Sequence, residues 1–382
     1  MKAIICKATF LMCWLLAAGQ SEIYAQHSHP KREIKKLMKE YNAVGLSVAV
    51  VKNNEIVYTH AFGWKDLQNR KKLKTRDIFR IASISKSFSA TSIMQLAEAG
   101  KLSLDDDFSR LIGFTVRNPK YPGIVITLKM VLSHTSSIND SQGYFNLDVI
   151  NPDTNPNYAA CYSDYPPGGG YRYCNLNFNM AGAVIEKISG ERFDQYVINH
   201  ILEPLHLYGG YCIDSLDKSL FAGLYEYDSA TQTYILATEA YNPRREEIKH
   251  YKAGYSTPVF SPTGGMKISA HDLALYMQMH MNMGTCNGIK IIGRESAQQM
   301  QTAVSLNEKY GLALWTTDTF IPGKVLKGHT GSAYGLYSAM FFSPEEKFGL
   351  VLITNGCNKE QVDGWNPLLK GAAQVLYRNY IQ

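Results

Sequence analysis

The sequence lacks a strong excess of charge of either sign. Its 382 residues include 39 Lys and Arg and 33 Asp and Glu, and the formal net charge at pH 7 is only +6. So mild a charge over this length argues against a nucleic-acid partner. The one dense basic run, residues 65–76, is interpreted as a solvated loop ahead of a helix, and a contact with a cell envelope is the alternative.

Cysteine is scarce as well. Seven are present, and five lie beyond residue 25: Cys161, Cys174, Cys212, Cys286 and Cys357. An odd number with irregular spacing defines no disulfide framework. No spacing typical of metal ligands appears, and the methionines around His280 are attributed to an apolar helix rather than to a soft-metal site. We therefore expect neither a metal nor an organic cofactor.

A marked hydrophobic run occurs at the N-terminus, but it is short. Lys2 and Lys7 accompany an apolar stretch over residues 9–18, and a small residue, Ala25, follows. This order is typical of a cleaved secretory signal peptide, residues 1–25, and the stretch is too short to span a bilayer. We expect an exported protein, periplasmic or secreted, without a stable membrane span; an uncleaved N-terminal anchor is the alternative.

Against this background, one segment combines a serine and a lysine at helical spacing. Residues 77–100 are predicted to pass from an extended run into a helix that ends at Gly100, with Ser83 at its start and Lys86 on the same face one turn later. The helix N-terminus favours a negative oxygen at the seryl position, and Lys86 with a lowered pKa could take the proton of Ser83. A capping serine and a solvated lysine are the alternative, which we prefer for the second copy of this spacing, Ser215 and Lys218.

A second polar motif, Tyr173-Cys174-Asn175, lies between a turn-forming stretch and a predicted helix that ends at Gly190. Tyr173 could act as a general acid or base, and Asn175 could donate to a substrate carbonyl. Cys174 is interpreted as a small filler at the edge of the site. The similar string at residues 144–146 lacks a following helix and is interpreted as a packed tyrosine and a turn asparagine.

The third motif, His329-Thr330-Gly331, precedes two predicted strands that join at residues 343–347. A glycine after a hydroxyl residue on an edge strand would let a substrate backbone lie close. Taken alone, the tripeptide would be no more than a strand-end histidine and a turn glycine.

In this order and with these spacings, the three motifs resemble those of the serine β-lactamase and penicillin-binding protein superfamily. The chain is more closely similar to the class C β-lactamase-related serine hydrolases, from about residue 32 to the C-terminus. Segments 126–138, 261–282 and 310–315 resemble further landmarks of that branch.

The resemblance implies a role for each motif. It makes Ser83 the acylated nucleophile, Lys86 and Tyr173 the proton-handling pair, and Asn175 a substrate-orienting group. The oxyanion hole would be formed by the backbone N–H groups of Ser83 and Ser332. The opposite wall of the site would be lined by His329, Thr330 and Gly331.

The order of predicted elements indicates an α/β (α+β) fold. A helix at 31–43, strands at 46–52 and 55–63, strands within 310–354 and a helix at 365–380 suggest an antiparallel sheet built from both termini and flanked by helices. We predict one β-lactamase/transpeptidase-like domain, residues 26–382, with a sheet lobe at about 31–76 and 300–382. An inserted, mainly helical lobe would span about 77–299, with the motifs in the cleft between the lobes.

Residues 151–167 are predicted to form a long surface loop over the cleft. Four tyrosines in or near this loop could build a wall of the substrate site or act only as packing anchors: Tyr144, Tyr158, Tyr162 and Tyr165.

His329 bears most directly on the substrate. It stands where the resemblance implies a lysine in β-lactamases, and a mostly neutral imidazole suits a substrate carboxylate poorly. We therefore expect an exported serine hydrolase that forms a covalent acyl-enzyme on ester, D-amino-acid amide or peptide bonds. Its substrate would be a small molecule or a peptide, for which the cell wall is one source. A β-lactamase or D-Ala-D-Ala carboxypeptidase, a non-turnover penicillin-binding sensor or scaffold, and a purely structural envelope protein are the alternatives.

Overall fold

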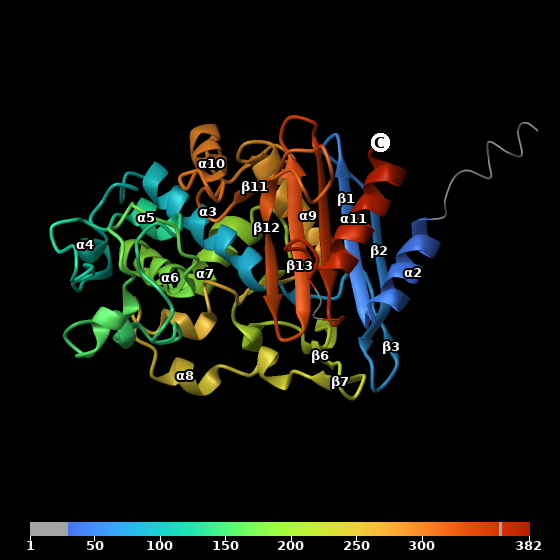
Figure 1. The fold of residues 1–382 in the computed structure, drawn as a ribbon, viewed down its shortest axis with the longest axis horizontal. Coiled ribbons are helices and arrows are strands. Elements are labelled where there is room, and N and C mark those ends of the chain that lie inside the picture. The colour runs from blue at the N-terminus through green and yellow to red at the C-terminus, as the bar shows by residue number, and fades with distance from the viewer. Residues whose placement is uncertain (1–29, 359–360) are drawn as a thin grey trace, which may run out of the picture.

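The computed structural model describes residues 30–358 and 361–382, so the predicted signal peptide lies outside the described residues. A seven-stranded antiparallel sheet forms the centre, in the order β11-β12-β13-β14-β1-β2-β3 (Figure 1). Its long strands come from both ends of the chain: β1 (Gly45–Lys52), β2 (Glu55–Asp66), β12 (Leu326–Ala333), β13 (Leu336–Ser343) and β14 (Phe348–Thr354). Both the predicted antiparallel sheet and its construction from the two termini are confirmed.

The central strands are apolar on both faces because both faces are covered. In β1, Leu46, Val48 and Val50 belong to one hydrophobic cluster, whereas Ala49 and Val51 belong to the other. The alternation follows from the two-residue period of a strand. The first cluster includes side chains of the terminal helices α2 (Pro30–Glu40) and α11 (Pro367–Tyr380), and the second includes those of α9 (Ala270–Met281).

The middle of the chain is mainly helical and lies at the β12 side of the sheet in Figure 1. Its longest helices are α3 (Ser85–Glu98) and α6 (Asn175–Ser189). The other helices are α4 (Phe108–Ile112), α5 (Leu128–Leu132), α7 (Phe193–Val197), α8 (Arg245–Lys249) and α10 (Arg294–Gln301). The short strands are β3 (Lys71–Lys72), β4 (Phe79–Arg80), β5 (Gly209–Gly210), β6 (Tyr225–Asp228), β7 (Thr233–Leu236), β8 (Lys267–Ile268), β9 (Thr285–Cys286), β10 (Ile289–Lys290) and β11 (Trp315–Thr317).

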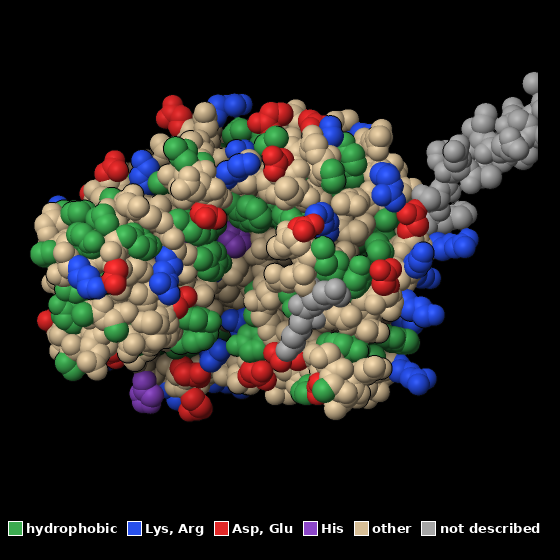
Figure 2. All heavy atoms as spheres, viewed as in Figure 1, with side chains coloured by type: hydrophobic (Ala, Val, Ile, Leu, Met, Phe, Trp, Pro, Cys, Tyr) green, Lys and Arg blue, Asp and Glu red, His purple; other side chains and the backbone are tan. Residues whose placement is uncertain are grey.

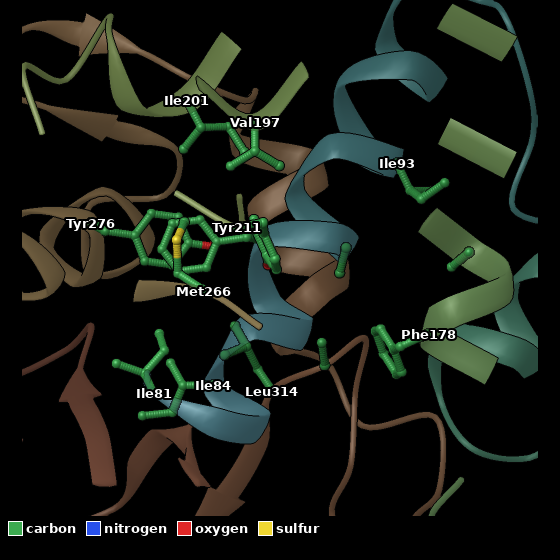
Figure 3. Packing of buried hydrophobic residues seen from close by; sticks show 14 of the residues in the cluster. Ile81, Ile84, Ile93, Phe178, Val197, Ile201, Tyr211, Met266, Tyr276 and Leu314 are labelled. Atoms are coloured by element: carbon green, nitrogen blue, oxygen red, sulfur yellow. The ribbon is translucent and has the colours of Figure 1, made fainter. Parts of the chain in front are cut away.

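Helix α3 is at the centre of the second cluster, because nearly all of its residues are buried. Figure 3 shows side chains from several elements meeting around it, including Phe178 of α6, Val197 of α7 and Tyr276 of α9. Phe88 of α3 stacks on Tyr276 with ring centroids 3.7 Å apart. A helix enclosed on all sides holds its first turn rigidly, which matters for the residues at its N-terminus.

Three boundaries differ from the sequence expectation. The first helix ends at Glu40 rather than residue 43, because Asn42 adopts a left-handed φ of 50°. Residues 310–314 are irregular, and the strand begins at Trp315. Helix α11 begins at Pro367, where Asn366 caps it.

The methionines of α9 pack as hydrophobic groups, and the five cysteines are buried, Cys174 with its thiol donating to Asp140 Oδ1 at 3.2 Å. Met277, Met279 and Met281 are buried in the core, and no cluster of His, Cys, Asp and Glu able to hold a metal ion occurs among the described residues. All five cysteines beyond residue 25 are buried and free. Within residues 30–358 and 361–382, no helix combines the length and apolar character needed to cross a bilayer.

Candidate active site

Ser83 lies in a single 3₁₀ turn, Ala82–Ile84, between β4 and α3. Ala82 has a left-handed φ of 50°, an unfavourable conformation for a residue with a side chain. Ser85 holds the turn: its hydroxyl donates to the Ala82 carbonyl at 2.6 Å and accepts from the Met266 N–H at 3.1 Å. The turn thereby presents Ser83, which is partly exposed, at the buried start of α3.

Lys86 is completely buried beneath Ser83. Its Nζ lies 3.1 Å from Ser83 Oγ, 2.9 Å from Asn175 Oδ1 and 3.0 Å from the Thr263 carbonyl. Burial lowers the pKa of Lys86 to about 7, and the negative charge of Asp140 partly offsets this effect. A neutral amine fits the three contacts, because its two N–H groups can donate to Asn175 and Thr263 while its lone pair faces the Ser83 hydroxyl.

Tyr173 lies over the same amine. Lys86 Nζ is 4.7 Å from the centroid of the Tyr173 ring, and the Tyr173 hydroxyl hydrogen-bonds the Ser83 side chain. The ring is 37% exposed, but desolvation of the hydroxyl raises its pKa well above the usual value, and the Ser83 contact offsets only part of the rise. Tyr173 is therefore a neutral phenol that can donate a proton at neutral pH.

Asn175 is the first residue of α6, and Asp140 sets its orientation. Asp140 Oδ2 accepts from both the backbone N–H and the side-chain Nδ2 of Asn175 at 2.9 Å, and Oδ1 accepts from the Leu176 N–H at 2.9 Å. Because a carboxylate only accepts, this arrangement directs Asn175 Oδ1 toward Lys86 and Thr263. The predicted donor role toward substrate is thus limited to the second amide hydrogen of Asn175.

We expect Asp140→Asn to weaken the fold and to shift the pH dependence of the proton transfer. The new amide would place a donor against a backbone or side-chain donor, at a cost of about 2 kcal/mol in unfolding free energy. Removing the charge also removes an influence that raises the pKa of Lys86, so the acid limb of kcat/KM should move to lower pH. Chemical denaturation and a pH–rate profile measure the two effects.

A matched control for this variant is Asp164→Asn. Asp164 is also paired, to Lys120, but its side chain is 80% exposed at the surface. We expect its pH profile to match that of the wild type. An unchanged acid limb in Asp140→Asn would contradict the electrostatic role of Asp140.

His329 lies on β12, facing Tyr173 and Tyr310. Its Nδ1 is 2.5 Å from the Thr330 carbonyl, which can only accept, so the proton resides on Nδ1. Nε2 then accepts from the Tyr310 hydroxyl at 3.2 Å. Burial, together with the positive charge of Lys86, lowers the pKa of His329 to about 3, and the imidazole is neutral at pH 7.

Thr330, Gly331 and Ser332 continue the wall beside Ser83. β11 pairs with residues 326–328, so within the described part of the chain no strand pairs with the outer side of residues 329–333. A Cβ at Gly331 would lie 2.2 Å from the Ile81 carbonyl, which shows that the glycine admits the chain's own turn at Ser83. Gly331 thus brings β12 close to Ser83, whereas the sequence had suggested room for a substrate backbone.

These residues surround one pocket of about 410 Å³, which includes Ser83, Tyr173 and residues 329–332. Figure 2 shows the surface hollowed between the helical part of the chain and the sheet, with a histidine side chain visible inside. Asn175 and Lys86 lie below the pocket rather than in its wall. All eight residues proposed from the sequence therefore converge here, from β12, the first residue of α6 and the loop before it, the 3₁₀ turn and the start of α3.

Three further residues complete the arrangement, and no role had been assigned to them individually. His134, with a left-handed φ of 60°, accepts from the Cys174 N–H through Nδ1 at 3.1 Å and packs against the Tyr173 ring at 4.4 Å. Thr263 supplies the carbonyl that Lys86 contacts, and Tyr310 supplies the partner of His329. Each of the three lies in one of the segments that resemble landmarks of the family, 126–138, 261–282 and 310–315. That resemblance was the sequence signal that could have pointed to them.

The four loop tyrosines do not form the pocket wall. Tyr162 is buried, and Tyr144 and Tyr158 pack against the hydrophobic core. The aromatic wall is formed instead by Tyr171, Tyr173, Tyr310 and Trp315.

The second copies of the motifs lie elsewhere. Ser215 donates to the Cys212 carbonyl at 2.9 Å, and Lys218 is exposed. Asn146 caps the short helical turn at residues 147–150. Neither copy lines the pocket beside Ser83.

In this fold a buried lysine adjoins a serine at the start of a helix, an arrangement whose chemistry suits acyl transfer. The sequence matches the Beta-lactamase family over residues 31–374, and the chain belongs to that family, within the serine β-lactamase and penicillin-binding protein superfamily. The superfamily and the mixed α/β architecture predicted from the sequence are both confirmed.

Known relatives agree with this assignment. Protein flp of Staphylococcus aureus (strain MRSA252) is 24% identical over 332 residues, which cover 83% of this chain and 60% of flp. The octameric penicillin-binding protein homologue from Pyrococcus abyssi has a TM-score of 0.71 at 25% identity, covering 91% of this chain and 76% of that one. D-amino acid amidase from Ochrobactrum anthropi SV3 shares the fold, with a TM-score of 0.69 at 20% identity and coverage of 92% and 97%. The chain spans about 60% of the length of flp.

Proposed function

We propose that this protein is an exported serine hydrolase of the class C β-lactamase-related type that cleaves ester, D-amino-acid amide or peptide bonds through an acyl-enzyme. The observation that carries the proposal is the 3.1 Å contact between Ser83 Oγ and the buried amine of Lys86, whose pKa is lowered to about 7. A lysine in this state is partly neutral at physiological pH and can act as a base. Membership of the family supports small-molecule or peptide substrates.

The reaction would proceed in two halves. Neutral Lys86 takes the hydroxyl proton as Ser83 Oγ bonds to the carbonyl carbon, and the backbone N–H groups of Ser83 and Ser332 stabilise the oxyanion. Tyr173 donates its proton to the leaving alcohol or amine as the scissile bond breaks, and Lys86 returns a proton to Tyr173. In the second half, Lys86 takes a proton from a water molecule as its oxygen bonds to the carbonyl carbon of the Ser83 ester. Tyr173 donates its proton to Ser83 Oγ as the acyl bond breaks, and Lys86 then returns the proton from water to Tyr173, which releases the acid and restores the serine.

The neutral state of His329 supports the choice of substrate. A carboxylate at this position would find an imidazole with a pKa of about 3 instead of a permanent cation. Esters and amides without such a carboxylate are therefore favoured over β-lactams and D-alanine termini.

Initial rates on three chromogenic substrates test the proposal: a short-chain aryl ester, a D-alanyl anilide and a cephalosporin. We expect turnover of the ester or the anilide and little of the cephalosporin. Rapid cephalosporin turnover would identify a β-lactamase and contradict the argument from His329. Intact-mass spectrometry distinguishes a non-turnover binding protein, which would accumulate an acyl adduct on Ser83 without steady-state product.

A further inference from the structure

The described lining of the pocket beside Ser83 includes no Lys or Arg that could bind a substrate carboxylate. Four aromatic side chains form its walls, Tyr171, Tyr173, Tyr310 and Trp315, and the strand residues 329–332 are neutral. Among the described residues that line it, Glu308 is the one Asp, Glu, Lys or Arg. The described wall of the pocket is therefore aromatic and holds one carboxyl group, while the amine of Lys86 lies beneath Ser83.

The lysines that flank this pocket in the sequence have other partners. Lys309 pairs with Asp318 at 3.7 Å, and Lys327 donates to the Gln301 carbonyl and the Thr316 hydroxyl at 3.1 and 3.0 Å. Lys86 lies beneath Ser83 with its own three contacts. Glu308 forms no ion pair among the described residues. Burial raises the pKa of the Tyr171 hydroxyl, and the nearby Glu308 raises it further.

The position of the pocket identifies the part of the substrate that it would hold. Tyr173, the proton donor in the proposed reaction, lines this pocket, whereas Asn175 does not. A leaving group receives its proton from the side on which it departs. In the proposed reaction, the part of the pocket beside Tyr171 and Tyr173 is thus on the leaving-group side of Ser83.

We propose that this pocket binds a leaving group that carries an alkylammonium cation, with Glu308 as its counter-ion and the aromatic walls as its cage. Aromatic faces attract ammonium groups, and a carboxylate adds a Coulombic attraction. An anionic leaving group would meet repulsion from Glu308 instead. The inference rests on the proposed acyl-enzyme function and specifies its substrate class.

Three thioesters with the same acetyl group test the inference: acetylthiocholine, its neutral isostere 3,3-dimethylbutyl thioacetate, and the anionic S-acetyl-3-mercaptopropionate. Released thiol is measured as kcat/KM for the wild type and for Glu308→Gln. The three leaving groups differ in intrinsic reactivity. The informative quantity is therefore the ratio of kcat/KM on acetylthiocholine to kcat/KM on the neutral isostere, compared between the wild type and each variant. We expect Glu308→Gln to lower the rate on acetylthiocholine about fivefold relative to the neutral isostere.

Two further variants sharpen the comparison. Glu308→Lys should lower the ratio of kcat/KM on acetylthiocholine to that on the neutral isostere about 25-fold. It should also raise kcat/KM on the anionic thioester relative to the neutral isostere. Glu345→Gln is the matched control, because Glu345 is likewise exposed but lies in the turn between β13 and β14, outside this pocket. We expect it to leave all three rates within twofold of the wild type.

The outcomes separate this inference from the function on which it rests. Ser83-dependent hydrolysis with an unchanged ratio in Glu308→Gln would overturn the inference and leave the hydrolase proposal intact. Absence of Ser83-dependent hydrolysis would count against the hydrolase proposal, and calorimetry with choline would then decide the inference. Choline binding that weakens at least threefold in Glu308→Gln would support it, and equal or undetectable binding to both proteins would overturn it.

Discussion

Ser83→Ala is expected to lower kcat/KM at least about 10⁴-fold on any substrate that the wild type turns over, because it removes the atom to which the acyl group bonds. The fold should persist, since Ser83 is partly exposed and the turn that holds it depends on Ser85 rather than on its own hydroxyl. Initial rates measure the loss, and circular dichroism with thermal unfolding shows that the variant is folded.

The chain contains its own control for this experiment. Ser215 precedes Lys218 at the same spacing, but its hydroxyl donates to the Cys212 carbonyl and lies outside the pocket. Ser215→Ala should retain wild-type rates. Equal losses in both variants, or full activity in Ser83→Ala, would contradict the assignment of the nucleophile.

Lys86→Met is expected to lower kcat/KM about 10³-fold, within the range that positioned proton transfer contributes. In the wild type, kcat/KM should rise with pH through about 7, as the buried amine loses its proton. The variant should lack that limb. A pH–rate profile of both proteins tests the expectation, and a loss of less than tenfold would show that another group accepts the proton.

The same variant should be more stable than the wild type near pH 7. The folded pKa of Lys86 is lowered to about 7, whereas an unfolded lysine has a pKa of about 10.4. Between these values the unfolded state binds more protons, so the stability of the wild type rises with pH over that window. A methionine carries no charge to desolvate, so the unfolding free energy of Lys86→Met should not show this rise with pH. Lys218→Met, at an exposed site, is the control and should leave the pH dependence unchanged.

Much of the fold could be predicted because its signals are local. The apolar runs of β13 and β14 and the glycine that ends α6 lie within the segments that they define. The serine and lysine of the first motif are three residues apart at the start of a helix, so their contact follows from helical geometry. The resemblance to a known superfamily then related motifs that are far apart in the chain.

The residues that tune the site could not be assigned in the same way. Asp140 orients Asn175 across 35 positions of sequence, and the Thr263 carbonyl reaches Lys86 across 177. His134 shows how the environment overrides residue type, since its burial lowers the pKa well below the usual value and leaves it an acceptor for the Cys174 N–H. Sequence spacing carries no information about such contacts.

The amino-acid sequence by itself therefore determined the helices, the central strands and the identity of the three motifs, because propensity, hydrophobic periodicity and short-range spacing act within a segment. Only the tertiary structure decided the state of each group. Enclosure of α3 desolvates Lys86, the close approach of β12 to the Ser83 turn requires a glycine at 331, and the walls from distant loops leave Glu308 as the charge of the pocket. Desolvation and Coulombic interactions depend on all neighbours in space, and the packing of the whole chain sets them.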